Sequence, residues 1–396
     1  MINKITLINP PSPFLLDQLM MPPLGILYVA AALKKQGVEV ELVDLALGEQ
    51  KIPWSDAYGI TANTTQFPLI QKFMNTHPFP NPDAKTCIGG PHATLCPKEC
   101  LNVGFDAVVA GEGEYAVFDF LKGTQGIINA PVIPDIDTIP FPDRDLVKDY
   151  DYRVDGKWTT TIMTSRGCPF GCAFCCKTWV GVRFRSWKNI VEELKEIKML
   201  GYEGIQFEDD AVWYNPKRDL KVFEHLKNLN LVWRAPMRAD FVTQERAKIM
   251  ASSGCKEIFI GVESGSDAIL TTINKGTTVK QNKYALKTLH EAGIGVKIGI
   301  VLGLPGESEK TLKETWSFCE EMEPCITAFG ITTLVPYPGS PIHDYPEKFD
   351  IQFDKNRIYE PHTGGDCIVS TSFLSNSVIS NWRMEFYRRF KGRDYA

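Results

Sequence analysis

Short runs of β-branched and other apolar residues alternate with amphipathic stretches along most of the chain, beginning with KITLIN at residues 4–9. This alternation is typical of parallel βα units, in which a helix follows each strand and covers the sheet. In the stretch 187–200, for example, Ile190, Leu194 and Ile197 recur at helical spacing on one face. The pattern therefore predicts an α/β protein.

The first part of the chain predicts an open parallel sheet. The strand at 4–9 is followed by the helix PLGILYVAAALKKQG, which ends at Gly37, and by the strand VEVELVDL. Further strands are expected in YGITAN, KTCIGGPH and DAVVAGEG. From 129 to 145 the chain is rich in proline, which disfavours both helices and central strands. We therefore predict a Rossmann-like domain over 1–128 and a linker over 129–154.

After the linker the alternation restarts with longer periods. Six strand-like runs follow one another: TTTIMTSRG, GIQFEDD, LVWRAPMRA, EIFIGVES, GVKIGIVLG and TAFGITTLVPY. A closed βα barrel needs eight such units, so six predict a partial (β/α)6 barrel, placed at 155–340. Residues 341–396 show no clear period and are predicted to form a C-terminal cap that ends in an aromatic and basic helix.

Composition narrows the class of protein. Of the 396 residues, 44% are hydrophobic and 23% are charged, as in ordinary globular proteins. The net charge of −5 gives no basic field for a phosphate backbone, so nucleic acid is a disfavoured partner. No apolar stretch reaches the roughly 20 residues of a membrane span and none resembles a signal peptide, which predicts a cytoplasmic protein. In that reducing compartment, clustered cysteines indicate metal binding or catalysis rather than disulfides.

The stretch RGCPFGCAFCCK, residues 166–177, places Cys168, Cys172 and Cys175 directly after the first predicted barrel strand. Catalytic groups of βα barrels lie on such loops, at the carboxyl ends of strands. Four thiolates saturate a cubane iron–sulfur cluster, whereas three leave one iron open for chemistry. The alternatives are a structural zinc site held by these three cysteines and Cys176, or buried cysteines that bind no metal. Because adjacent cysteines point in different directions, we treat Cys176 as a bystander.

This stretch resembles the C-x3-C-x-Φ-C signature of radical S-adenosylmethionine (SAM) enzymes, with Phe174 at the aromatic position near the adenine. The resemblance implies a [4Fe–4S] cluster held by Cys168, Cys172 and Cys175. It also implies that the amino and carboxylate groups of SAM chelate the open iron.

The resemblance implies further SAM contacts on the barrel. In FEDDAV, Asp209 or Asp210 is expected near the methionine amino group, with a solvated turn as the alternative. Arg238 is expected either to face the SAM carboxylate or to form an ordinary surface salt bridge.

Two later strands carry similar implications. The segment IFIGVESGSD resembles the family's contact with the ribose and methionine ends of SAM, which assigns that role to Glu263 and Ser264. A charged residue within an apolar strand is costly unless it is paired, which favours a function. In KIGIVLGLPGES, Gly303 is expected where small residues let the adenine approach the backbone, although a glycine at a strand turn would serve equally.

The N-terminal domain lacks the G-x-G-x-x-G turn of dinucleotide-binding folds, since its first turn reads INPPSPF. Its segments resemble instead the cobalamin-binding domain of cobalamin-dependent radical SAM proteins. No D-x-H-x-x-G string is present, so the resemblance implies cobalamin without a histidine ligand on cobalt. The expected cobalamin contacts are Pro23, Leu24, Gly25, Gly89, Gly90, His92, Gly111, Glu112, Gly113 and Glu114. His92 can equally be a hydrogen-bonded turn residue.

Cys87, Cys96 and Cys100 raise the question of a second cluster in this domain. Their spacing is uneven and Cys87 lies in a predicted strand, so we interpret them as core thiols.

Together these resemblances imply an enzyme that cleaves SAM to a 5′-deoxyadenosyl radical, most simply a cobalamin-dependent C-methyltransferase acting on an unactivated carbon. The alternatives are a cobalamin-dependent radical cyclase or rearrangement enzyme, and a methylthiotransferase-like enzyme without cobalamin. A small-molecule substrate and an external one-electron donor of the flavodoxin or ferredoxin type are the expected partners.

Overall fold

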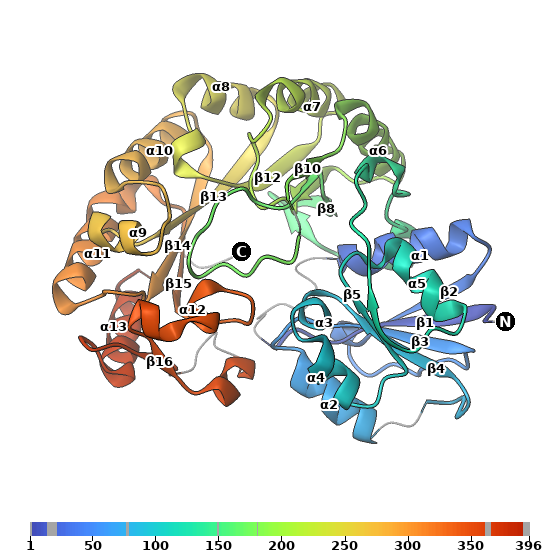
Figure 1. Cartoon of the computed structure of the whole chain (residues 1–396). Coiled ribbons are helices and arrows are strands. Elements are labelled where there is room, and N and C mark those ends of the chain that lie inside the picture. The colour runs from blue at the N-terminus through green and yellow to red at the C-terminus, as the bar shows by residue number, and fades with distance from the viewer. Residues whose placement is uncertain are drawn as a thin grey trace. The chain divides into compact units, whose positions relative to one another are not determined.

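The computed structural model describes residues 2–13, 22–76, 79–148, 150–179, 181–360 and 366–390. The chain divides into two compact units (Figure 1). The first consists of Met1–Tyr152, Thr178–Arg183 and Tyr359–Pro361, and the second contains the rest. The predicted division into 1–128, 129–154, 155–340 and 341–396 stays a prediction.

Within its described residues, the first unit is built on a six-stranded parallel sheet of order β2-β1-β3-β4-β5-β6. The strands are β1 (Lys4–Asn9), β2 (Glu39–Asp44), β3 (Ala57–Thr61), β4 (Lys85–Gly89), β5 (Ala107–Ala110) and β6 (Gly126–Asn129). The connecting helices are α1 (Leu24–Lys35), α2 (Phe67–Thr76), α3 (Pro91–Leu95), α4 (Pro97–Asn102) and α5 (Gly113–Leu121). The predicted Rossmann-like sheet is confirmed, and the short β6 is an addition to it.

Apolar residues on both faces of this sheet explain why the helices pack there. One core contains Leu27 and Phe120 from α1 and α5, and the other contains Tyr58 and Phe67. A parallel sheet buried on both faces needs such near-continuous apolar strands. The predicted linker over 129–154 also packs on this unit, since Val147 lies in the first core.

In the described part of the second unit, a seven-stranded sheet has the order β15-β14-β13-β12-β11-β8-β7. Its strands are β7 (Arg153–Val154), β8 (Lys157–Ile162), β11 (Gly204–Phe207), β12 (Val232–Met237), β13 (Cys255–Glu263), β14 (Gly295–Leu302) and β15 (Ala328–Thr333). All are parallel except β7, which pairs antiparallel with β8. The predicted partial (β/α)6 barrel is therefore confirmed.

Helices cover the outer face of this curved sheet (Figure 1). They include α6 (Trp187–Met199), α7 (Pro216–Leu229), α8 (Gln244–Ser252), α9 (Asp267–Thr272), α10 (Val279–Glu291) and α11 (Glu309–Met322). Residues alternate along each strand, so that Trp233 packs outward against Phe223 of α7 with ring centroids 4.9 Å apart. The neighbouring Arg234 therefore lies on the inner face.

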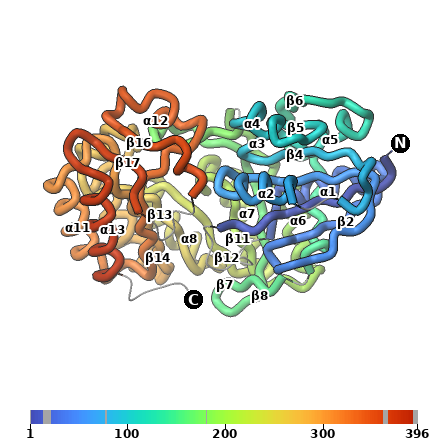
Figure 2. Tube along the Cα trace, turned by 90° about the horizontal axis from the view of Figure 1, so that it is seen from below, coloured from blue at the N-terminus to red at the C-terminus, as the bar shows by residue number. Residues whose placement is uncertain are grey.

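The C-terminal region contains α12 (Pro341–Asp344), β16 (Gln352–Phe353), β17 (Val369–Ser370) and α13 (Asn376–Phe390). Helix α13 lies beside α11 in both views (Figures 1 and 2). Trp316 of α11 contacts Phe386 with ring centroids 5.0 Å apart, and Phe329 of β15 stacks on Phe390. The aromatic helix predicted at the C-terminus thus covers the last barrel strand. Among the described residues, no helix is long and apolar enough to cross a membrane.

Gly90, after β4, allows a test of local packing. Its φ is +95°, and a Cβ there would lie 2.8 Å from Thr61 Oγ1 and 2.9 Å from the Ala62 carbonyl oxygen. Gly104 has a similar φ of +108° but nothing within 4 Å of such a Cβ. We expect Gly104→Ala to lower the free energy of unfolding by about 1–2 kcal/mol, the cost of left-handed backbone. Gly90→Ala should cost about 1–3 kcal/mol more because of the clash, measured by urea titration. Equal losses in the two variants would contradict this packing.

Candidate active site and cofactor-binding loops

The cysteine loop leaves the carboxyl end of the barrel through β9 (Ser165–Arg166), which continues the path of β8. The Cys168 thiol accepts a hydrogen bond from the Tyr214 hydroxyl at 3.3 Å. Cys172 is buried, and its thiol hydrogen-bonds with that of Cys175, which lowers the pKa of Cys172 to about 6. The loop therefore carries the three predicted ligands at the edge of the sheet where barrel enzymes carry their chemistry, and it brings the Cys172 and Cys175 thiols into contact.

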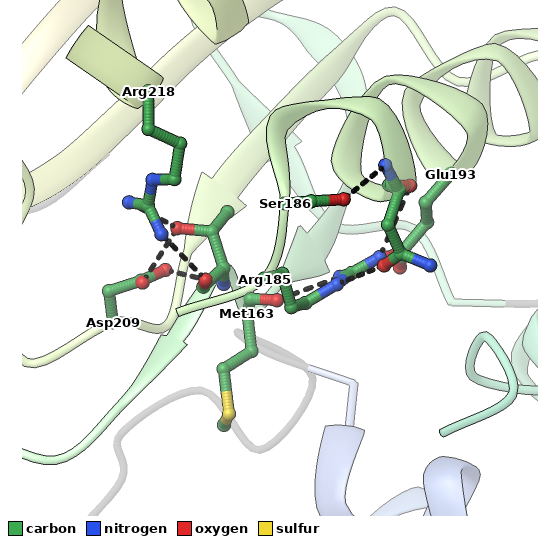
Figure 3. A network of polar contacts seen from close by, with 8 residues as sticks. Met163, Arg185, Ser186, Glu193, Asp209 and Arg218 are labelled. Atoms are coloured by element: carbon green, nitrogen blue, oxygen red, sulfur yellow. Dashed lines mark hydrogen bonds and ion pairs between the residues drawn. The ribbon is translucent and has the colours of Figure 1, made fainter. Parts of the chain in front are cut away.

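A buried carboxylate fixes the start of this loop (Figure 3). Asp209 accepts hydrogen bonds from the Thr164 amide at 2.9 Å, from the Thr164 hydroxyl at 2.8 Å and from the Ser165 hydroxyl. Arg218, also buried, donates to the Thr164 carbonyl at 2.8 Å. Burial raises the pKa of Asp209, and the bond from Ser165 and the charge of Arg218 oppose that rise. Both oxygens of Asp209 are thus committed to the protein, whereas Asp210, the other predicted SAM contact, is exposed.

A second buried pair holds the adjacent backbone (Figure 3). Arg185 forms an ion pair with Glu193 of α6 and donates to the Met163 carbonyl at 2.8 Å. Neither side chain is more than 5% exposed. Breaking a buried pair costs several kcal/mol, so the end of β8 is held firmly on both sides.

Two cations lie next to the cysteine loop. Lys275 pairs with Glu263 at 2.6 Å, and its ammonium lies 5.8 Å from the centre of the Phe174 ring. The guanidinium of Arg238 lies 3.5 Å from the centre of the Phe170 ring. After the bond with Cys175, these cations also lower the pKa of Cys172. Three thiols beside two positive charges fit an anionic iron–sulfur cluster, which the resemblance implies here.

The remaining predicted SAM contacts, Glu263, Ser264 and Arg238, are all buried. Glu263 has a φ of +65°, which is rare for a residue other than glycine, and is turned toward Lys275. The Ser264 hydroxyl is fully buried and lies 3.1 Å from the Thr315 hydroxyl. Arg238 is also bonded to Asp240, at 2.9 Å. Their contacts with SAM stay predictions.

Gly303 is held by a residue that the sequence reading did not single out. Its amide donates to the buried Glu307 carboxylate at 2.5 Å. A Cβ on Gly303 would lie 2.9 Å from Val369, so the backbone packs closely under the C-terminal region. Glu307 ends the motif KIGIVLGLPGE, so a signal for it was present in the sequence. Lys275 had no such signal, because it lies in a polar turn without periodicity.

Polar residues line the inner face of the barrel near the same edge. Gln206 donates to Glu208 at 2.7 Å and accepts from Arg234, which lies 3.7 Å from Glu257. Burial raises the pKa of Glu208 to about 7. Ile205, next to Gln206 in the strand, is fully buried under the outer helices. Because side chains alternate along a strand, Gln206 then faces the inside of the barrel. The interior thus offers charged and hydrogen-bonding groups to a polar ligand.

In the first unit, the predicted cobalamin contacts lie along one edge of the sheet. Pro23, Leu24 and Gly25 are at the start of α1, Gly89, Gly90 and His92 follow β4, and Gly111, Glu112, Gly113 and Glu114 follow β5. Sheets of this order bind ligands where the strand order reverses, which is between β1 and β3. Gln66, after β3, donates to the Pro10 carbonyl after β1 at 2.7 Å and links these two loops. The sequence reading missed this β3 loop because it contains no glycine.

Three of these side chains point into the protein. His92 is 0% exposed, and its ring lies 4.2 Å from that of Phe67. Glu112 pairs with Arg183 at 2.7 Å and accepts from the Ile133 amide, and Glu114 is buried. The glycines and the start of α1 therefore remain the better fit to a corrinoid, and the cobalamin contacts stay predictions.

Comparison with known families now identifies the two units. The radical SAM superfamily model matches residues 162–319, which contain the cysteine loop and most of the barrel. The B12 binding domain model matches residues 18–121. The chain thus combines a B12-binding domain with a radical SAM domain. These two matches agree with the family that its motifs resemble.

The chain is similar to an uncharacterised methyltransferase of Pyrococcus horikoshii, at 29% identity over 98% of this chain and 92% of that protein. It is 26% identical to the anaerobic magnesium-protoporphyrin IX monomethyl ester cyclase of Cereibacter sphaeroides, over 93% of this chain and 67% of the cyclase. The fold matches that of the cobalamin-dependent SAM radical enzyme OxsB with aqua-cobalamin bound, with a TM-score of 0.72 and 20% identity over 97% of this chain and 66% of that one.

The raised pKa of Glu208 predicts how the stability of the protein changes with pH. In the unfolded chain a glutamate has a pKa near its ordinary value of 4.5, against about 7 in the fold. The folded state therefore holds the proton more tightly, and Glu208 lowers the free energy of unfolding as pH rises from about 4.5 to 7. We expect Glu208→Gln to stabilise the protein relative to wild type more at pH 8 than at pH 5, in urea titrations without ligands. A difference between the two proteins that is independent of pH would contradict the shift.

Proposed function

We propose that this protein is a cobalamin-dependent radical SAM methyltransferase that methylates an unactivated carbon of a small molecule. The observation that carries the proposal is the presence of three cysteines on one loop, at the carboxyl edge of a partial barrel, in a chain that also matches the B12 binding domain model. When bound, the cofactors supply the hard chemistry, namely reductive cleavage of SAM to a 5′-deoxyadenosyl radical and a methyl group carried on cobalt.

In this proposal the chain holds and orients the cofactors. Cys168, Cys172 and Cys175 bind the [4Fe–4S] cluster, and Lys275 and Arg238 balance its negative charge. Since Asp209 is occupied by the backbone of the loop, Asp210 is the better candidate to receive the SAM amino group. A carboxylate at that position would accept a hydrogen bond from that amino group.

The polar inner face of the barrel supports a polar small molecule as the substrate. Arg234 and Glu208 offer a cation and a proton-carrying carboxyl, and Gln206 joins them. Such convergent polar groups in an enclosed site fix the orientation of a ligand. An external one-electron donor of the flavodoxin or ferredoxin type would reduce the cluster. A reducing cytoplasm suits the unpaired thiols.

Methylation is preferred over cyclisation because the similarity to the methyltransferase of P. horikoshii extends over nearly all of both chains. The cyclase extends well beyond the matched region, since the match covers 67% of its length. A radical cyclase or rearrangement enzyme is the alternative. A methylthiotransferase-like enzyme without cobalamin is less well supported, because the B12 binding domain model matches this chain.

The test is anaerobic reconstitution with iron, sulfide and hydroxocobalamin, followed by incubation with methyl-deuterated SAM, a reductant and a small-molecule extract of the source cells. The proposal predicts retained cobalamin, 5′-deoxyadenosine, S-adenosylhomocysteine and a deuterated methyl product. 5′-Deoxyadenosine without S-adenosylhomocysteine would favour the cyclase alternative. Absence of both products would overturn a radical SAM function.

Single cysteine-to-alanine variants distinguish the predicted cluster ligands from Cys176. Cys172→Ala should lose the iron–sulfur cluster and all SAM cleavage, since two thiolates no longer hold a cubane. Cys176→Ala, a neighbour on the same loop, should keep the iron content and the 5′-deoxyadenosine yield of wild type. The checks are iron and sulfide analysis after reconstitution and the product assay. Loss of the cluster in Cys176→Ala would instead indicate four protein ligands.

A further inference from the structure

The first unit contains a second set of possible metal ligands, well separated in sequence from the cysteine loop. The side-chain donor atoms of His92, Cys96 and Glu99 all lie within 4.8 Å of one another. Helix α3 carries His92, helix α4 carries Glu99, and Cys96 lies at the junction of the two helices. The corner between these short helices therefore brings one nitrogen, one sulfur and one oxygen donor together.

The buried imidazole is arranged as a ligand would be. Nδ1 of His92 lies 3.3 Å from the Thr64 hydroxyl, whereas Nε2, among the described residues, has no hydrogen-bond partner. Nε2 instead faces a carboxylate oxygen of Glu99 at 3.6 Å. With the proton on Nδ1, a buried nitrogen and a partly exposed carboxylate oxygen face each other as two acceptors, and a cation between them removes the penalty of leaving Nε2 unsatisfied.

Neighbouring groups orient both ligands. The Tyr359 hydroxyl donates to Oε1 of Glu99 at 2.7 Å, which leaves Oε2 on the side of His92. The imidazole ring is packed by Phe67 and by the edge of Tyr359. Metal-binding histidines and carboxylates are held by such outer partners, which fix the tautomer and the rotamer.

We propose that His92, Cys96 and Glu99 form a mononuclear site for divalent zinc. Imidazole, thiolate and carboxylate are the donors that zinc takes in tetrahedral sites, and three protein ligands leave a fourth position for water or a ligand. Cys96 is half-buried, so the site has an approach from solvent. The nearby Cys100 is fully buried in the second core of the unit and is not among the ligands. The site would brace the turn after β4, and it is independent of the methyl-transfer proposal.

The test uses the full chain with Cys168, Cys172 and Cys175 replaced by alanine and produced without cobalamin, so that neither cofactor site contributes metal. After equilibration with zinc and gel filtration, we expect one zinc per chain by mass spectrometry of the metal content. Cobalt(II) should give a thiolate charge-transfer band that disappears in Cys96→Ser.

In this background, Cys96→Ser and Glu99→Gln should each weaken zinc binding at least tenfold in a chelator competition. Glu99→Gln keeps the shape of the side chain and an acceptor for Tyr359. The control Cys325→Ser, another half-buried cysteine, should bind zinc like the parent. If the triple variant does not fold, the zinc content of the reconstituted wild-type protein and of its Cys96→Ser variant decides. No zinc, or zinc unaffected by Cys96→Ser and Glu99→Gln, would show that His92 is a neutral core histidine and overturn the proposal.

Discussion

The candidate active site depends on the hydrogen bonds that the buried Asp209 carboxylate accepts from Thr164 and Ser165. These bonds tie the end of β8 to the end of β11, two residues before the cysteine loop begins. The buried Arg218 forms an ion pair with Asp219, and its charge also opposes the rise in the pKa of Asp209. The backbone at Thr164 and Ser165 is therefore fixed by hydrogen bonds and charges from outside the loop. This fixed start of the loop determines where the thiols lie.

Above that anchor, the loop lies next to two ion pairs, Lys275–Glu263 and Arg238–Asp240, that other elements of the fold supply. Lys275 follows α9 and Arg238 follows β12, yet the charges of both lower the pKa of Cys172. The unusual backbone of Glu263 turns its carboxylate toward Lys275 and so fixes that ammonium. Backbone strain of this kind costs about 1–3 kcal/mol and persists at functional sites where surrounding contacts enforce it. The arrangement suits the binding of an anionic cluster by neutral and cationic neighbours.

The sequence predicted both sheets and the cysteine loop, because strand periodicity and ligand spacing are local signals. It could not separate the roles of Asp209 and Asp210, since adjacent aspartates read alike until burial distinguishes them. His92 was ambiguous for the same reason, as a glycine-rich turn fits both a cobalamin loop and a buried ring. The position of Lys275 beside the cysteine loop could not be predicted, because its pairing with Glu263 depends on how α9 packs. The pattern along the sequence does not show which side chains of different helices and strands contact one another.

The central claim is that three thiolates leave one iron of the cluster open to SAM. Mössbauer spectroscopy of protein reconstituted with iron-57, recorded before and after SAM is added, tests this most directly. The account predicts that SAM moves one iron site away from the other three, because nitrogen and oxygen ligands then replace its exchangeable ligand. A spectrum that does not change with SAM would contradict it and point to a cluster sealed by a fourth protein ligand.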